Sequence, residues 1–283
     1  MTIQELKRYF QTELNDLYTE SETHFLYSVF IQKIIGLNSF QQRNLSHQEL
    51  LIDDEKQIKN SIIQLKSGRP YQQVLGETEF FGMHFFVDEN VLIPRPETEE
   101  LLELAIQKIK SHSFPSDSIQ VLDIGTGSGI IPIVLKKHFP QIKVYSIDTS
   151  EKALETAKKN AAFHETPIHF IHDNYLEMDL DQVYDIIISN PPYIGIDEEH
   201  EIADSVKEFE PKMALFSPTE DPLIFYKKIA RDTEKHLEKN GLLFLEINQK
   251  LGAETLNLYS SSLSEFELIK DLSENDRFIY GRK

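Results

Sequence analysis

The sequence VLDIGTGSG at residues 121–129 joins a short apolar run to residues 130–138, which have the pattern of a helix. Glycines at a turn of this kind let a strand pass tightly into a helix and let a ligand come close to the backbone. The loop alone is weak evidence of function, because dinucleotide-binding sites use a similar one. Their spacing, however, is GxGxxG, whereas the glycines here follow the pattern GxGxG.

Strand-like and helix-like segments alternate from this loop onward. We expect strands at residues 120–124, 143–148, 168–172, 185–189 and 242–247, and helices near residues 130–138, 151–163 and 222–238. Such alternation predicts an α/β fold with a mostly parallel sheet covered on both faces. Ligands of such sheets bind beyond the carboxyl ends of the strands, where the strand order reverses. The candidate residues Gly125, Asp148, Asn174 and Asn190 all fall at such ends.

Asp148 ends the predicted strand that follows the glycine loop. An acid about 20 residues beyond such a loop commonly accepts ribose hydroxyls. The alternative is a role in starting the helix that we predict from Glu151. The co-occurrence of the loop and this acid favours a nucleoside-binding site.

The motif Asn190-Pro191-Pro192-Tyr193 follows the apolar run 184–189, which we predict to be a buried strand. Two successive prolines cannot extend a strand, so the chain must leave the sheet there. The side-chain oxygen of Asn190 and the carbonyl of Pro191 then offer two acceptors, which suit the two donors of a planar NH2 group. Tyr193 offers a ring face to a flat amide or base. A simple strand-ending turn is the alternative, since Asn-Pro pairs mark turns.

Together these motifs resemble a class I S-adenosylmethionine-dependent methyltransferase that acts on an amide or amino nitrogen. Two upstream segments, GETEFFG at 76–82 and VLIPRPETE at 91–99, make the chain similar to the peptide chain release factor N5-glutamine methyltransferases, the PrmC or HemK family. The resemblance extends from residue 68 to the end of the chain. The sequence departs from the family pattern at Glu274, where the family has glycine, and at Asn248, where it usually has glycine.

The resemblance implies a seven-stranded, Rossmann-like methyltransferase domain at residues 96–283, closed by two antiparallel strands at 265–270 and 277–281. It implies a linking β-hairpin at 76–95 and a role in substrate recognition for residues 1–75. The cofactor would be S-adenosylmethionine, without a metal, and the substrate the glutamine of the Gly-Gly-Gln loop of a release factor. The long acidic stretch 195–218 is expected to help cover that substrate.

The expected site residues fall into three groups, and the roles of Arg95 and Glu97 stay open. Cofactor binding is expected of Gly125, Thr126, Gly127, Ser128, Gly129, Asp148, Asn174 and Asn190. Catalysis is expected of Asn190, Pro191 and Tyr193, and substrate binding of Asn190, Pro191, Pro192 and Tyr193.

The first 75 residues are predicted to form a small all-α bundle. Apolar residues such as Leu6, Phe10 and Leu14 recur at helical spacing, and Gly36 is suited to end a helix. Residues Ser46 to Glu49 resemble a capping box, which predicts a helix start. In the hairpin that follows, residues 88–90 are the candidate turn.

Bulk composition narrows the class of protein. The 29 basic and 47 acidic residues give a net charge of −18, the opposite of the basic footprint that nucleic-acid binding needs. The chain has no cysteine, so it has neither disulfides nor zinc-thiolate sites. No apolar stretch approaches a membrane span, and the first residues lack an apolar signal core, so we expect a soluble cytoplasmic protein.

Three other functions would account for part of the sequence. A DNA or RNA N-methyltransferase would also suit the Asn190 motif, but the acidic balance argues against it. A nicotinamide oxidoreductase would need the GxGxxG spacing and would leave the Asn190 motif unexplained. A non-catalytic cofactor-binding or scaffold protein would not need the intact motif.

Overall fold

The computed structural model describes residues 1–114 and 118–283. Its contacts divide the chain into two compact units, Met1–Gly76 and Glu77–Lys283. The hairpin predicted at residues 76–95 belongs by its contacts to the second unit.

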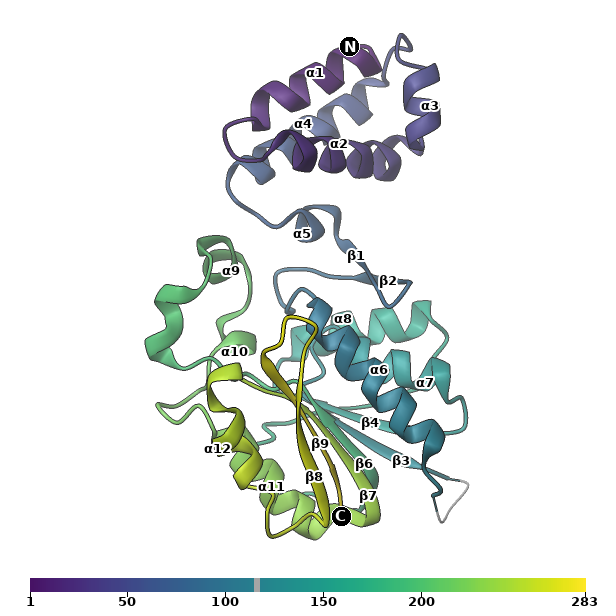
Figure 1. The fold of residues 1–283 in the computed structure, drawn as a ribbon. Coiled ribbons are helices and arrows are strands. Elements are labelled where there is room, and N and C mark those ends of the chain that lie inside the picture. Colours follow the sequence, from purple (N-terminus) through teal and green to yellow (C-terminus); the bar gives the residue numbers. More distant parts are fainter. Residues whose placement is uncertain (115–117) are drawn as a thin grey trace. The chain divides into compact units, whose positions relative to one another are not determined.

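The first unit is a helical bundle around one apolar core (Figure 1). Leu6, Phe10 and Phe30 are fully buried in it. Gly36 ends α2 in the left-handed conformation, with φ 76°, as predicted. The helices are α1 (Ile3–Leu14), α2 (Glu20–Ile35), α3 (Ser39–Asn44), α4 (Ile52–Lys66) and α5 (Tyr71–Leu75).

The predicted helix start at Ser46 is wrong, because α4 begins at Ile52 and residues 45–47 form a turn. The segment is used by another helix instead. The carbonyls of Ser46 and Gln48 accept the N–H groups of Gln4 and Ile3, which lie in the first turn of α1 and lack partners within that helix.

The second unit opens with the antiparallel hairpin of β1 (Glu77–Phe80) and β2 (Met83–Phe86). Its two turn residues, Phe81 and Gly82, have φ values of 52° and 68°, as in a type I′ turn. A turn does occur at Glu89 and Asn90, within the predicted range 88–90. It is not the hairpin turn, which comes earlier because Gly82 readily takes positive φ. Asn160 holds β2 to the unit, since its side chain accepts from the N–H of Phe86 and donates to the carbonyl of the same residue.

The predicted seven-stranded sheet is confirmed, with the order β5-β4-β3-β6-β7-β9-β8. All neighbouring strands from β5 to β7 are parallel, and β9 pairs antiparallel with both β7 and β8. The strand order reverses between β3 and β6, which places a switch point at their carboxyl ends. The strands are β3 (Gln120–Ile124), β4 (Lys143–Asp148), β5 (His169–His172), β6 (Tyr184–Ser189), β7 (Leu237–Glu246), β8 (Glu265–Lys270) and β9 (Asp276–Arg282).

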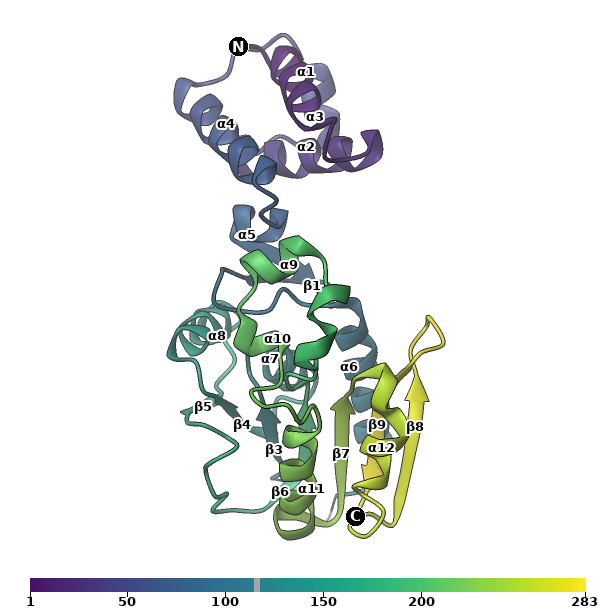
Figure 2. The same ribbon diagram turned by 90° about the vertical axis from the view of Figure 1, so that its left-hand side faces the viewer.

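Helices cover both faces of this sheet (Figure 2). One face packs against α6 (Pro96–Ser111), α7 (Ile130–His138) and α8 (Glu151–Phe163), and the other against α11 (Ile224–His236) and α12 (Gly252–Asn257). Strand β6 shows why both faces are apolar. Its Ile186 and Ile188 lie in the first layer and Ile187 in the second, and all three are fully buried.

Residues 195–218, predicted as a long loop, fold into short helices. They contain the 3-10 helix η1 (Ile196–Glu201), α9 (Asp204–Phe209) and α10 (Lys212–Leu215). An isolated β-bridge between Ile194 and Phe216 joins the two ends of this segment. A further 3-10 helix, η2 (Gln249–Leu251), follows β7.

Glu274 occupies a position that favours glycine, since its φ is 64°. Glycine there removes the strain of a left-handed residue but loosens the unfolded chain. We expect Glu274→Gly to raise the free energy of unfolding by about 0.5–1 kcal/mol in denaturant titrations. Glu274→Ala, which removes the charge but keeps the Cβ atom, should give no such gain. Equal effects of the two variants would attribute the change to charge rather than to φ.

Candidate active site

The glycine loop between β3 and α7 contains three positive φ values, 83° at Gly125, 55° at Gly127 and 82° at Gly129. The three glycines serve different contacts. A Cβ atom on Gly129 would lie 3.1 Å from the Cβ of Ala157, so this glycine lets α7 pack closely on α8. A Cβ atom on Gly125 would lie 3.5 Å from the carbonyl oxygen of Asn190. Gly125 thus brings the loop against the Asn190 motif at the switch point.

Asp148 ends β4 beside this loop. Its Oδ2 accepts the N–H of Gly127 at 2.8 Å, and its Oδ1 accepts the N–H of Ser150 at 2.9 Å. The N-cap of α8 is Ser150, whose hydroxyl accepts the N–H of Ala153, so Asp148 is not the capping residue. Burial raises the pKa of Asp148, against the hydrogen bonds that lower it. Each carboxylate oxygen keeps a lone pair for a further donor.

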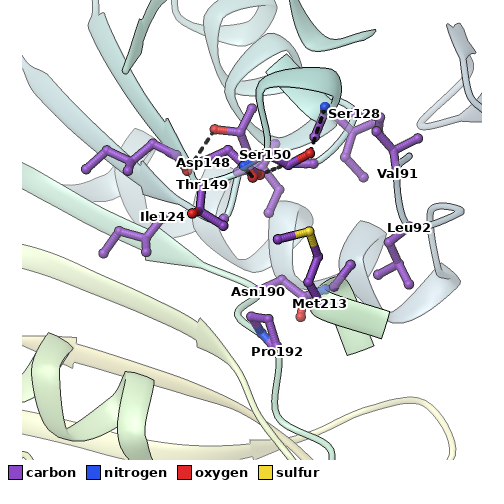
Figure 3. Close-up of a pocket in the computed structure, with 18 of the residues that line it drawn as sticks. Val91, Leu92, Ile124, Ser128, Asp148, Thr149, Ser150, Asn190, Pro192 and Met213 are labelled. Carbon is purple, nitrogen blue, oxygen red and sulfur yellow. Dashed lines mark hydrogen bonds between the residues drawn. The ribbon is translucent and has the colours of Figure 1, made fainter. Parts of the chain in front are cut away.

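A cavity that is open to solvent lies beyond the carboxyl ends of β3, β4 and β6. Figure 3 draws Asp148, Thr149 and Ser150 around one part of it and Asn190, Pro192 and Met213 around another. Of the expected site residues, eight line the cavity: Gly125, Thr126, Gly127, Ser128, Asp148, Asn174, Asn190 and Pro192. Gly129, Pro191 and Tyr193 do not belong to this lining.

The side chain of Asn190 is held from below by Thr98 in the first turn of α6. Its Nδ2 donates to the Thr98 hydroxyl at 3.1 Å, and that hydroxyl donates to Glu246 Oε2 at 2.7 Å. The other oxygen of Glu246 accepts the hydroxyl of Tyr193 at 3.2 Å. Glu246 ends β7 and is 1% exposed. The two polar side chains of the motif therefore share one buried carboxyl group.

Several known proteins are similar to this one over nearly the whole chain. A release factor glutamine methyltransferase of Flavobacterium psychrophilum is 42% identical over 99% of this chain and 98% of the relative. The enzyme of the same name from Bacteroides thetaiotaomicron is 34% identical over 97% of this chain and 98% of the relative. The chain belongs to the release factor glutamine methyltransferase family.

Two further matches agree with this family. The family model described as "Methyltransferase small domain" matches residues 103–208. The crystal structure of a methyltransferase from Pyrococcus furiosus superposes with a TM-score of 0.51 at 15% identity, over 82% of this chain and 99% of that one. At that identity the superposition shows the shared fold alone.

The structure adds residues at the cavity and next to it that were not among the expected site residues. Thr98 and Glu246 lie 148 positions apart, and no local pattern connects them. Arg95, flagged without a role, lines the cavity and pairs with Glu210 at 2.6 Å. Glu210 also accepts the N–H of Ile93 at 2.9 Å, so it ties residues 195–218 to the segment before α6. Met213 and Phe225 complete the apolar part of the lining.

Asn248, where this methyltransferase departs from the family glycine, is closer to the site than its sequence position indicates. Its Nδ2 donates to the carbonyl of Tyr193 at 3.2 Å and to Glu198 Oε1 at 2.9 Å. A glycine could make neither bond. The side chain therefore connects the Asn190 motif to η1.

Asp123, within the glycine-loop sequence, is fully buried. It accepts a hydrogen bond from Ser146, and its Oδ1 has no partner among the described residues. Burial raises the pKa of Asp123 to about 7, and the hydrogen bond from Ser146 only partly offsets this.

A pH dependence of stability follows from Asp123. Its folded pKa lies above the unfolded value of about 3.9, so its stabilising contribution is present below pH 4 and is lost as the pH rises towards 7. Asp123→Asn keeps the shape and stays neutral. We expect denaturant titrations to show a smaller loss of unfolding free energy between pH 5 and pH 7.5 for this variant than for the unmodified protein. Equal losses in both would contradict the assignment.

Among residues 1–114 and 118–283, no helix is long and apolar enough to cross a membrane. In the same ranges, no three His, Asp or Glu side chains are grouped as ligands of a metal ion. His169 stacks on Tyr145, and the His172 ring lies 3.1 Å from the carbonyl of Thr149.

Proposed function

We propose that this protein transfers a methyl group from S-adenosylmethionine to the side-chain amide nitrogen, N5, of the glutamine in the Gly-Gly-Gln loop of a peptide chain release factor. It would thereby act in translation termination. The observation that carries the proposal is Asn190 at the cavity, with its Nδ2 engaged by Thr98 and its Oδ1 left to accept. The names of the relatives support a release factor as the substrate.

The cavity fits S-adenosylmethionine by the chemistry of its lining. Gly125 and Gly127 have positive φ values, which glycine adopts readily, and they leave the loop without side chains where the methionine part would approach. Asp148 has free lone pairs for the two ribose hydroxyls. Asn174 lies at the end of the next strand, β5, where it would flank the adenine. When bound, the cofactor supplies an electrophilic methyl group on a positively charged sulfur.

Asn190 and Pro191 would position the amide of the substrate. A carboxamide nitrogen is a poor nucleophile, because its lone pair is delocalised into the carbonyl. Asn190 Oδ1 and the Pro191 carbonyl would each accept one N–H of the glutamine and so direct the nitrogen at the methyl group. Holding two reactants in attack geometry lowers a barrier by roughly 7–11 kcal/mol. Both bonds strengthen as positive charge develops on nitrogen, so they favour the transition state. As the new N–C bond forms, the S–C bond would break with its electron pair left on sulfur, and the nitrogen would lose one of its two protons to solvent.

Tyr193, which lies next to the cavity and not in its lining, is proposed to pack its ring on the amide plane. In the structure its hydroxyl is fixed by Glu246, and its ring lies against the apolar layer below α11. Burial and the nearby Glu246 raise the pKa of the Tyr193 hydroxyl well above its usual range. It therefore stays neutral and is not a base for the amide.

The parts outside the cavity would hold the remainder of the release factor. The helical unit Met1–Gly76 is proposed as a substrate-recognition domain, and residues 195–218 as a cover for the inserted loop. Their proposed role makes a test possible, because remote contacts position the reacting group. A short Gly-Gly-Gln peptide should react far more slowly than the intact factor.

The test is to incubate the protein with labelled S-adenosylmethionine and, separately, a release factor, DNA and ribosomal RNA. Mass spectrometry of the factor should show one added methyl group, on the glutamine of the Gly-Gly-Gln loop. Replacing that glutamine by alanine in the factor is the control and should abolish labelling. Labelled nucleic acid with an unmodified factor would replace this proposal by an N-methyltransferase of bases.

A further inference from the structure

The carboxyl group of Glu246 is buried beneath the Asn190 motif, and its two described hydrogen-bond donors are neutral hydroxyls. Thr98 donates to Oε2 at 2.7 Å and Tyr193 to Oε1 at 3.2 Å. The nearby Arg277 pairs with Asp271 instead, at 3.2 Å. Burial raises the pKa of Glu246 to about 7, while the bond from Thr98, the charge of Arg277 and the bond from Tyr193 lower it.

Burying a carboxyl group of this kind costs free energy compared with burying an apolar side chain of similar size. Polar groups taken from water cost free energy unless they are well bonded, and apolar replacements of similar volume are often neutral or stabilising. Glu246 has an apolar side chain beside it on the same face of the sheet, since its cross-strand partner on β9, Phe278, is buried in the first apolar layer. Its position therefore calls for a role other than packing.

The direction of the hydrogen bonds supplies that role. The ionised carboxylate can only accept, so the single proton of the Thr98 hydroxyl goes to Glu246. The Thr98 oxygen must then accept from its other neighbour, which is Asn190. This requires the NH2 end of the Asn190 amide to face Thr98, and it turns Oδ1 the other way. Without Glu246, the Thr98 proton would be free to bind Oδ1, and the amide would have no preferred orientation.

We propose that Glu246 is a positioning residue that, through Thr98, fixes the Asn190 side-chain amide with Oδ1 free to accept a substrate N–H, and that holds the Tyr193 hydroxyl with its second oxygen. The inference rests on the proposed function of Asn190 as an acceptor. Thr98, which also lines the cavity, connects Glu246 to Asn190. The arrangement joins α6, β7 and the Asn190 motif, so each of these elements helps to orient the reacting amide.

The first experiment needs no turnover. The side-chain NH2 resonances of Asn190 are assigned by NMR as those lost in Asn190→Ala, and their exchange with water is measured in the cofactor-free protein at pH 8. We expect Thr98→Val, which loses the hydroxyl at nearly constant volume, to speed this exchange at least tenfold. Thr98→Ser keeps the hydroxyl and should exchange as the unmodified protein does. Unchanged exchange in Thr98→Val would overturn the proposal.

The second experiment measures kcat with the intact release factor and the Kd of S-adenosylmethionine, also at pH 8. A small misplacement of a reacting group costs up to about 100-fold, so Thr98→Val should lower kcat by roughly 10- to 100-fold. Cofactor Kd should stay within about twofold, and Thr98→Ser should retain most of the turnover. A Thr98→Val protein whose kcat equals that of the unmodified protein would contradict the inference.

Glu246→Leu tests the carboxyl group itself. It should lower kcat at least as much as Thr98→Val does, since it also removes the acceptor of the Tyr193 hydroxyl. The double variant should be no worse than Glu246→Leu alone, because Thr98 acts through the same chain of bonds. Additive losses would show that Glu246 acts independently of Thr98 and would overturn the proposal. If Glu246→Leu does not fold, the comparison of Thr98→Val with Thr98→Ser still tests the proposal. If the unmodified protein does not methylate the factor, the proposed function fails, while the exchange measurement still judges the positioning.

Discussion

Replacing Asn190 by alanine is expected to lower turnover on the release factor by about 10²–10³, the scale seen when one aimed hydrogen-bonding group is lost from an active site. The substrate amide would keep one acceptor, the Pro191 carbonyl, and could rotate about that single bond. Its nitrogen would then spend little time directed at the methyl group. Because the bond strengthens as charge develops on nitrogen, the loss should appear in kcat rather than in substrate binding.

Asn174→Ala is the matched control for Asn190→Ala. Both residues line the same cavity, but Asn174 follows β5 and would contact the adenine. We expect Asn174→Ala to raise the Kd of S-adenosylmethionine, measured by calorimetry, with little change in kcat at saturating cofactor. Asn190→Ala should instead lower kcat and leave the Kd of S-adenosylmethionine nearly unchanged. If it weakened cofactor binding and kept its turnover at saturating cofactor, Asn190 would be a cofactor residue and not an orienting one.

Regular elements near the glycine loop were predictable because their patterns are local. Strands β3 and β4 and helices α7 and α8 have the predicted bounds. Strand β7 was less predictable and starts at Leu237 instead of residue 242. Its first part, Glu238 to Asn240, is polar and exposed, so the apolar run that marks the strand begins only after Gly241.

Long-range polar contacts could not be predicted in the same way. The glycine loop, Asp148 and Asn190 each end a strand, and parallel topology gathers such ends at one edge. Thr98 lies in the family-like segment 91–99 and Glu246 ends β7, but neither local pattern connects the two residues, and their relation to Asn190 exists only after α6 packs on the sheet. The capping-box prediction at Ser46 failed for a similar reason, since contacts with α1 override the local pattern.

The cofactor half of the site is tested most directly at Asp148. Asp148→Ala should weaken S-adenosylmethionine binding by at least about 100-fold in calorimetry, the free-energy equivalent of about 2.7 kcal/mol. Two losses add up in this variant. The ribose hydroxyls lose charged acceptors, whose hydrogen bonds contribute about 1.5–3 kcal/mol. The N–H of Gly127 also loses the carboxylate that holds the loop in place.

Two further variants separate these losses at Asp148. Asp148→Asn keeps one acceptor oxygen and the shape of the side chain, so it should bind more tightly than Asp148→Ala and more weakly than the unmodified protein. Asp173→Ala removes an exposed acid that lies one residue beyond β5 and does not line the cavity, and it should change the Kd by less than about threefold. Tighter binding of NAD than of S-adenosylmethionine by the unmodified protein, or an Asp148→Ala variant that binds the cofactor normally, would contradict the assignment. With both halves tested, a loss of affinity at Asp148 and a loss of turnover at Asn190 would divide the cavity into a part that binds the cofactor and a part that orients the amide.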